Sequence, residues 1–342
     1  MAIDKIPRFL LGAVSADSPP SSSFDWGMWM QSTSEMQAWN ADVGKKMSFW
    51  CQTAWAPNQT WNDSNDLWWT IQDIVDNAYI NDAEPVVLWS INPYIPANVL
   101  YNQNFTDGIW DTYLRELASN MAADGRIIHF RPFWEMNGLG YEGCGWGARW
   151  NAKWYANAED AYSNRNPINT PETFIAMWRH VVDIFREEGA TNVKFWFTVA
   201  PLPSEGYEGH DNIGAVPLAN IYPGDSYVDY LGYEFYNYNT QSGNYIDSQH
   251  IQGIYHELTD LNLTKPVIVA EAGLFTDDDN YAKNWWSKAL DPTYIKILYP
   301  RTSGILVWNA DGSDGCGFNT SAKRAQAIGA FRAASYKDGA TS

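Results

Sequence analysis

The sequence predicts a (β/α)8 barrel formed by residues 1–342 as a single domain, and two observations support this prediction. Short apolar segments alternate with amphipathic stretches from end to end, and no linker or run of charge divides the chain. The apolar segments are rich in Val, Ile, Leu and aromatic residues with little polar alternation, which is typical of strands buried on both faces of a parallel sheet. A doubly wound sheet is the alternative fold, but no glycine-rich phosphate loop follows the first apolar segment.

Eight apolar segments have the length and composition of buried strands. They cover residues 9–14, 47–51, 85–91, 127–133, 193–199, 228–234, 266–271 and 304–308. Glu135 follows the fourth segment and Glu271 ends the seventh. Catalytic residues of such barrels come from the C-terminal ends of strands, so both glutamates are candidates.

The amphipathic stretches predict the intervening helices. The clearest begins at Thr170, Pro171 and Glu172, which supply a cap, a proline at the first helical position and an acid in the first turn. Apolar residues then recur at helical spacing until Gly189, which ends this helix. A second helix is predicted from the apolar residues between Trp110 and Met121 and ends at residues 124–125. Further helices are predicted over residues 66–79, 247–261, 278–290 and 321–334, whereas residues 200–227 are predicted to be mostly loop.

Composition favours a neutral ligand. The net charge of −18 would repel nucleic acid and anionic membranes, and no apolar run approaches the roughly 18 residues of a membrane-spanning helix. The chain contains 19 Trp and 20 Tyr, and flat aromatic rings stack against the C–H faces of sugars. We therefore expect a monomer whose partner is a neutral polysaccharide or oligosaccharide, with no nucleic acid and no membrane.

The sequence contains no metal or cofactor motif. Cys51, Cys144 and Cys316 form no CxxC pair, so a zinc site is not indicated, and one disulfide is left open with its pairing undefined. The histidines form neither HxH nor HExxH. Asn-x-Ser/Thr sequons begin at five positions, which favours a secreted or extracellular protein. Residues 1–7 lack the features of a signal peptide, so we expect that a signal peptide is either absent or already removed.

Two glutamates that follow buried strands are the strongest functional signal. Glu135 lies among aromatic residues where a strand gives way to a glycine-containing loop, and Glu271 is followed closely by Gly273. A desolvated carboxyl is costly unless a partner or a reaction requires it. Glycoside hydrolysis uses such a pair, with one carboxyl as proton donor and the other as nucleophile or base. Two unrelated buried ion pairs are the alternative interpretation.

Residues 131–138, Arg-Pro-Phe-Trp-Glu-Met-Asn-Gly, resemble the Arg-Pro-Tyr/Phe-His-Glu-Met-Asn-Gly signature of glycoside hydrolase family 26, a member of clan A. Segments similar to later elements of that family follow in its order, so the resemblance covers residues 85–310. The family contains chiefly β-mannanases, with some β-1,3-1,4-glucanases and β-1,3-xylanases.

The resemblance implies a role for each matching residue. Glu135 would be the general acid/base and Glu271 the nucleophile, and Tyr236 would hydrogen-bond that nucleophile. Arg131 could hold Glu271 ionised or form an ion pair inside the barrel, with Glu234 as its partner or as a third carboxylate of the site. The candidate substrate-binding residues are Trp308, which matches the tryptophan beneath the −1 sugar, together with Tyr236, Arg131, Trp134, Trp146, Asn137 and Trp89, which could line the cleft or fill the core.

One departure from the signature bears on specificity. Trp134 stands where the family has His, so the hydrogen bond of that imidazole must be replaced or lost. Trp134 and Phe133 should also raise the pKa of Glu135. We therefore expect a retaining, endo-acting glycoside hydrolase without cofactors that cleaves β-1,4-mannan or a related decorated mannan. The alternatives are a β-1,3-1,4-glucanase or β-1,3-xylanase of the same family, a non-catalytic carbohydrate-binding barrel, and a metal-dependent hydrolase on the same barrel.

Overall fold

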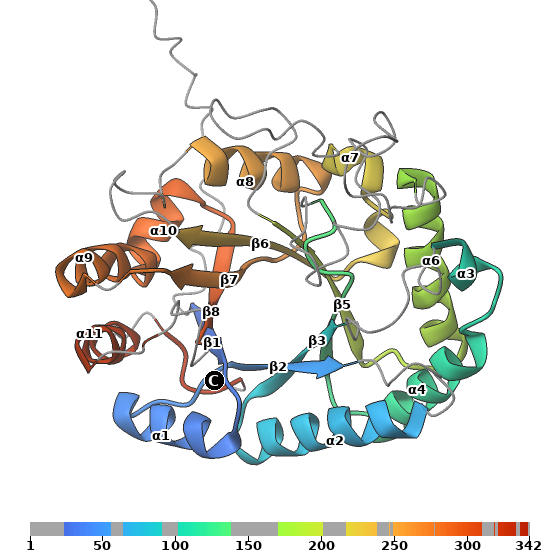
Figure 1. Cartoon of the computed structure of the whole chain (residues 1–342), viewed down its shortest axis with the longest axis horizontal. Coiled ribbons are helices and arrows are strands. Elements are labelled where there is room, and N and C mark those ends of the chain that lie inside the picture. The colour runs from blue at the N-terminus through green and yellow to red at the C-terminus, as the bar shows by residue number, and fades with distance from the viewer. Residues whose placement is uncertain are drawn as a thin grey trace, which may run out of the picture.

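A computed structural model of the chain describes residues 24–55, 64–90, 102–137, 170–200, 217–237, 246, 249–276, 278–309, 318, 321–332 and 336–340. Within these ranges, parallel strands form a closed barrel in the order β1 to β8. The helices surround the outside of the barrel, with α3 lying beside α6 and α9 beside both α10 and α11 (Figure 1). The predicted (β/α)8 architecture is confirmed.

The strands agree with the predicted segments except at the start. Residues 9–14, the predicted first strand, lie outside the described residues, and β1 holds that position because it pairs with both β2 and β8. The strands are β1 (Asp25–Trp29), β2 (Phe49–Trp55), β3 (Glu84–Ser90), β4 (Ile128–Pro132), β5 (Val193–Val199), β6 (Tyr230–Asn237), β7 (Val267–Leu274) and β8 (Thr302–Trp308).

β1 was not predicted from the sequence because it is not a continuous apolar segment: Asp25 begins it and Gly27 lies at its centre. Close packing explains this glycine. A Cβ at Gly27 would lie only 2.3 Å from the carbonyl oxygen of Phe49 on β2, so no larger residue fits between the two strands.

The helices pack against the outside of the barrel and bury its outward-facing side chains. The predicted helix after Thr170 is confirmed as α6, with the Thr170 side chain accepting a hydrogen bond from the backbone of Thr173. The sequence did not predict α1, α3 and α10, nor the short helix α7, which lies within the predicted loop of residues 200–227. The helices are α1 (Thr33–Val43), α2 (Ser64–Ile80), α3 (Asn102–Thr106), α4 (Asp111–Asp124), α6 (Pro171–Glu187), α7 (Leu218–Ile221), α8 (Gln249–Leu261), α9 (Asp279–Ala289), α10 (Pro292–Leu298) and α11 (Ser321–Phe331). Among the described residues, no helix is long and apolar enough to cross a membrane.

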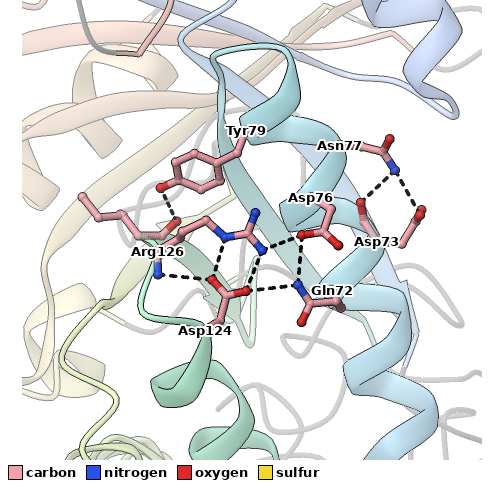
Figure 2. Close-up of polar contacts among 8 residues, drawn as sticks. Gln72, Asp73, Asp76, Asn77, Tyr79, Asp124 and Arg126 are labelled. Atoms are coloured by element: carbon pink, nitrogen blue, oxygen red, sulfur yellow. Dashed lines mark hydrogen bonds and ion pairs between the residues drawn. The ribbon is translucent and has the colours of Figure 1, made fainter.

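Polar side chains tie the helices together at the N-terminal end of the barrel. Figure 2 shows Arg126, which precedes β4, between Asp124 at the end of α4 and Asp76 on α2. Arg126 Nη2 lies 2.6 Å from Asp124 and 2.5 Å from Asp76, and Gln72 of α2 donates hydrogen bonds to both carboxylates. This network fixes α2 and α4 relative to the entry of β4.

The barrel interior is filled at the same end. Trp196 Nε1 donates to His129 Nδ1 at 2.8 Å, so a neutral His129 carries its proton on Nε2 and donates to Glu84 at 2.6 Å. Phe49 packs edge-on against both His129 and Trp196. These side chains fill the interior at the N-terminal end of the barrel, and barrels of this kind bind ligands at the C-terminal ends of the strands.

Candidate active site

The C-terminal ends of β4, β6 and β7 bring together the charged side chains of the site. Arg131 lies on β4 and Glu271 on β7, while Glu234 on β6 is the Cα partner of Glu271 in the sheet. All three side chains are buried, and Arg131 and Glu234 have no solvent exposure. One guanidinium therefore faces two carboxyls in a space shielded from water.

Arg131 holds Glu271 more closely than it holds Glu234. Its Nη2 donates to Glu271 Oε1 at 2.9 Å and to Glu234 Oε1 at 3.3 Å, and its Nη1 donates to the carbonyl oxygen of Ala270. The ion pairs expected from the sequence are thus present with both glutamates. Because Arg131 is completely buried, however, it cannot meet substrate as a binding residue. Its part is to position Glu271.

Tyr236 supplies the second hydrogen bond to Glu271. Its hydroxyl donates to Oε2 at 2.5 Å, so each oxygen of the carboxylate accepts one short hydrogen bond. Donors on both oxygens suit an ionised carboxylate with a fixed orientation. The expectation that Tyr236 hydrogen-bonds Glu271 is met by this geometry.

Glu135 lies on a strained turn after β4. Phe133 and Glu135 have left-handed backbones, with φ of 55° and 54°, a conformation that costs non-glycine residues roughly 1–3 kcal/mol each. Two contacts enforce the turn. The ring of Phe133 is buried against aromatic residues that include Trp178, and the N–H of Glu135 donates to the carbonyl of Thr198 on β5 at 3.2 Å.

Asn137 fastens the end of this turn to β5. Its Nδ2 donates to the carbonyl of Ala200 at 3.1 Å, and its Oδ1 accepts from the Ala200 N–H at 2.7 Å. The side chain is buried. Asn137 was expected to bind substrate, but with its amide engaged by the Ala200 backbone it instead holds the turn that carries Glu135.

The carboxyl of Glu135 titrates near neutral pH. Burial raises the pKa of Glu135 to about 7, opposed by a hydrogen bond with Glu234 and increased further by the charge of Glu271. Burial, followed by the charges of Glu271 and Glu135, raises the pKa of Glu234 well above its ordinary value. Glu135 can therefore hold a proton at neutral pH, as a general acid requires.

Aromatic side chains form the rim of the same opening. Trp308 ends β8 and Trp29 ends β1, and their rings stack with centroids 4.5 Å apart and planes inclined by 22°. Trp29 Nε1 donates to Thr53 Oγ1 at 3.0 Å, which fixes the pair. Trp29, Trp308 and Trp134 are all partly exposed and pack on the apolar barrel interior. They offer ring surface to a ligand at the opening.

Two other predicted tryptophans do not join this rim. Trp89 is buried and stacks on Phe130, in the layer between barrel and helices, so it fills the core rather than the cleft. Its neighbour Leu88 belongs to the barrel interior, and successive strand residues face opposite sides. Trp146 lies outside the described residues.

Trp29 was not among the predicted site residues, because β1 was not predicted as a strand. A tryptophan followed within a few residues by a Ser-capped helix, as Ser32 caps α1, is the signal that could have found it. Cys51 is a free, buried thiol on β2, which excludes it as a disulfide partner, whereas Cys144 and Cys316 lie outside the described residues. Within the described ranges, no cluster of three or more His, Cys, Asp or Glu side chains could hold a metal ion.

Comparison with known proteins gives one similar sequence and several similar folds. No protein-family model matches the chain. Over 245 residues, 69% of this chain, it is 33% identical to endoglucanase H of Acetivibrio thermocellus, and it spans 23% of that protein's length. Its fold is similar to a GH26 β-mannanase from Bacteroides ovatus (TM-score 0.60, 15% identity, 93% of this chain and 90% of that chain). It is also similar to a GH26 protein from a Muricauda species (TM-score 0.59, 16% identity, 93% and 92% covered). The resemblance to glycoside hydrolase family 26 seen in the motif is therefore confirmed in the fold.

Proposed function

We propose that this chain belongs to glycoside hydrolase family 26 and is a retaining, endo-acting hydrolase of a β-linked polysaccharide. The observation that carries the proposal is one opening that holds two carboxyls in different states. Glu271 accepts hydrogen bonds from Arg131 and Tyr236, whereas the pKa of Glu135 is raised to about 7. Double displacement needs one carboxyl as acid and one as nucleophile. The relative named an endoglucanase supports the same reaction class.

In the proposed mechanism, Glu271 attacks the anomeric carbon of the −1 sugar while Glu135 gives its proton to the leaving glycosidic oxygen. Arg131 and Tyr236 orient the attacking carboxylate and stabilise its charge until the covalent bond forms. In the second step, Glu135 takes a proton from a water molecule, whose oxygen displaces Glu271 from the sugar. The tryptophans at the rim stack on the sugar ring.

The substrate that we propose first is β-1,4-mannan or a decorated mannan. A GH26 β-mannanase is among the solved structures with a similar fold, which supports this choice. The alternative is a β-glucan, and it is favoured by the relative at 33% identity, an endoglucanase. An intact polysaccharide cannot enter a cell, so the proposed substrate also supports an extracellular site of action.

A substrate panel tests the choice. Purified protein would be incubated with linear mannan, galactomannan, glucomannan, mixed-linkage β-glucan and β-1,3-xylan, and the products sized. We expect oligosaccharides of several lengths early in the reaction, because an endo-acting enzyme cuts within the chain. Absence of hydrolysis on every substrate, with retained binding, would instead indicate a carbohydrate-binding barrel. Loss of activity in chelator would indicate the metal-dependent alternative.

Variants of the two glutamates test the mechanism. Glu271→Ala should lower kcat by about 10³-fold or more while polysaccharide binding persists, because no neighbour can supply the covalent bond. Glu135→Ala should lose far less activity on a substrate with an activated phenol leaving group than on polysaccharide, because that leaving group needs little proton donation. Equal losses on both substrates would argue against Glu135 as the acid. Glu84→Gln, at the packed end of the barrel, is the control.

A further inference from the structure

The site holds one carboxyl more than double displacement uses. Glu234 is completely buried, and its contact with Arg131, at 3.3 Å, is longer than the 2.9 Å contact between Arg131 and Glu271. Its second oxygen, Oε2, is buried and receives no hydrogen bond from a donor among the described residues. A buried carboxylate with one long contact and one bare oxygen is strongly disfavoured relative to the neutral acid.

The charges around Glu234 lead to the same result. The groups that act on it are Arg131 from β4, Glu135 from the turn after β4 and Glu271 from β7. Cys51 of β2 lies beside Arg131, but burial raises the pKa of its thiol to about 12, so it adds no charge. If all three carboxyls were ionised, three negative charges would face one positive charge. Glu271 has the two short hydrogen bonds and takes the charge that Arg131 balances.

We propose that Glu234 is a carboxylic acid that stays protonated throughout the reaction and donates its O–H hydrogen bond to Glu135. In this role it is a positioning residue that sets the pH at which Glu135 loses its proton. The inference rests on the proposed function, because it assigns to Glu135 the part of the acid/base. The raised pKa of Glu234 and the opposing effect of its hydrogen bond on Glu135 agree with this arrangement.

The proton inventory of the two steps balances without Glu234 changing state. When Glu135 gives its proton to the leaving oxygen, it becomes a carboxylate, and the O–H of Glu234 then donates to a charged acceptor, which strengthens the hydrogen bond. When Glu135 takes a proton from water in the second step, the contact returns to its first state. The proton of Glu234 stays on Glu234.

Two variants distinguish a neutral Glu234 from an ionised one. Glu234→Gln keeps a donor toward Glu135 and an acceptor toward Arg131, so the high-pH limb of the kcat/KM profile should stay within about 0.3 pH unit of the parent protein. Glu234→Leu removes the donor that stabilises the Glu135 carboxylate. It should therefore raise the pKa of Glu135 and move that limb to higher pH by about one unit.

The opposite shift would overturn the proposal. If Glu234 were ionised, Glu234→Gln would remove a negative charge beside Glu135, and the limb would move to lower pH by about one unit. Glu84→Gln is the control, because it makes the same change in a partly buried carboxyl that contacts His129 at the opposite end of the barrel. That variant should leave the limb where it is.

An infrared measurement reads Glu234 without catalysis. The parent protein at pH 9 should show the carbonyl stretching band of a buried carboxylic acid, and the band should be missing from Glu234→Gln. Its absence from the parent protein would refute the proposal even if the protein hydrolyses polysaccharide. If no substrate is hydrolysed, the proposed function fails, while this band still decides the state of Glu234. The measurement also covers the case in which Glu234→Leu does not fold.

Discussion

At the scale of single residues, Arg131 organises the site. Its guanidinium contacts both Glu234 and Glu271 while completely buried. A guanidinium suits this position because its planar fork stays charged and can serve several acceptors at once. The strained turn after β4 places Glu135 near the same two carboxyls. The charges of the site therefore come from Arg131 and three glutamates.

Tyr236→Phe should lower kcat by about 10- to 100-fold, because Glu271 loses a hydrogen bond to a charged acceptor. The measurement is kcat on the best polysaccharide of the panel. Tyr233→Phe is the matched control on the same strand, since the Tyr233 hydroxyl bonds Thr302, away from the site. We expect this control to lose stability but keep its kcat. A Tyr236→Phe enzyme with unchanged kcat would show that the hydrogen bond does not assist the nucleophile.

Trp134→His should increase activity on linear mannan sharply. An indole N–H donates one hydrogen bond and accepts none, whereas an imidazole can do both, so under the proposed function Trp134 would offer the −1 sugar fewer polar contacts than a histidine. We therefore expect the native protein to act modestly on linear mannan and better on a decorated or mixed-linkage glycan. Comparing kcat/KM on these substrates for both proteins checks this. A native protein that already prefers linear mannan by a wide margin contradicts it.

At the scale of elements, the site depends on how closely β5 and β6 approach each other. Thr198 on β5 and Gly232 on β6 are paired in register, and a Cβ added at Gly232 would lie 2.6 Å from Thr198 Cγ2 and 3.0 Å from Ala270 Cβ. β5 also anchors the turn of Glu135 through its carbonyls and through Asn137. The glycine therefore sets the spacing on which both Glu234 and Glu135 depend.

Gly232→Ala should destabilise the fold by about 1–3 kcal/mol, because the added methyl overpacks the interior. Adding Thr198→Ser removes the methyl that clashes most and should restore part of the loss. Chemical denaturation of the single and the double variant would measure both changes in the free energy of unfolding. Gly329→Ala is the control, since a Cβ there has nothing within 4 Å and the residue lies in α11. That change should stabilise the protein by about 0.5–1 kcal/mol. A Gly232→Ala variant as stable as the parent would contradict the close-packing account.

At the scale of the whole molecule, stability and chemistry lie at opposite ends of the barrel. The Arg126 network and the His129 contacts close the N-terminal end, and the backbone of Gly339 and Ala340 bonds to Lys46 and Asp82, which precede β2 and β3. The C-terminal ends of the strands instead hold buried charge and strained backbone, which cost stability. The packed end supports a site that would not be stable by itself.

Glu135→Gln should therefore be more stable than the parent protein at pH 8, by about 1–3 kcal/mol. The folded-state pKa of Glu135 is about 7, against 4.5 for an ordinary glutamate. Below the lower value both states are protonated, and the group has no effect. As pH rises toward 7 the unfolded chain loses its proton first, so the parent protein loses stability. Denaturation at pH 4 and pH 8 should show a gain that appears only at pH 8. A gain of equal size at both pH values would contradict the assigned shift.

Much of the architecture follows from sequence because its signals are local. The capped helix after Thr170 and the apolar segments from β2 to β8 each depend on neighbouring residues, so they could be predicted without knowing the fold. The motif at residues 131–138 and the apolar segment 266–271 likewise suffice to predict the two candidate carboxyls, since residues at the C-terminal ends of barrel strands lie close together.

The remaining features depend on contacts between distant parts of the chain. Leu88 and Trp89 are both apolar, so composition does not tell which faces the interior, and only barrel closure directs Trp89 to the core. β1 is defined by its pairing with β2 and β8, which lie far from it in sequence, and close packing against Phe49 requires the glycine at its centre. Arg131 and Glu271 are 140 positions apart in sequence but form a hydrogen bond in the fold. The protonation state proposed for Glu234 depends on this contact, because Arg131 is held closer to Glu271 than to Glu234. The scaffold and the two candidate carboxyls can thus be predicted from residues that are neighbours in sequence. How charge and protons are divided among the carboxyls depends on tertiary contacts, because electrostatic energy varies with distance and burial and not with order along the chain.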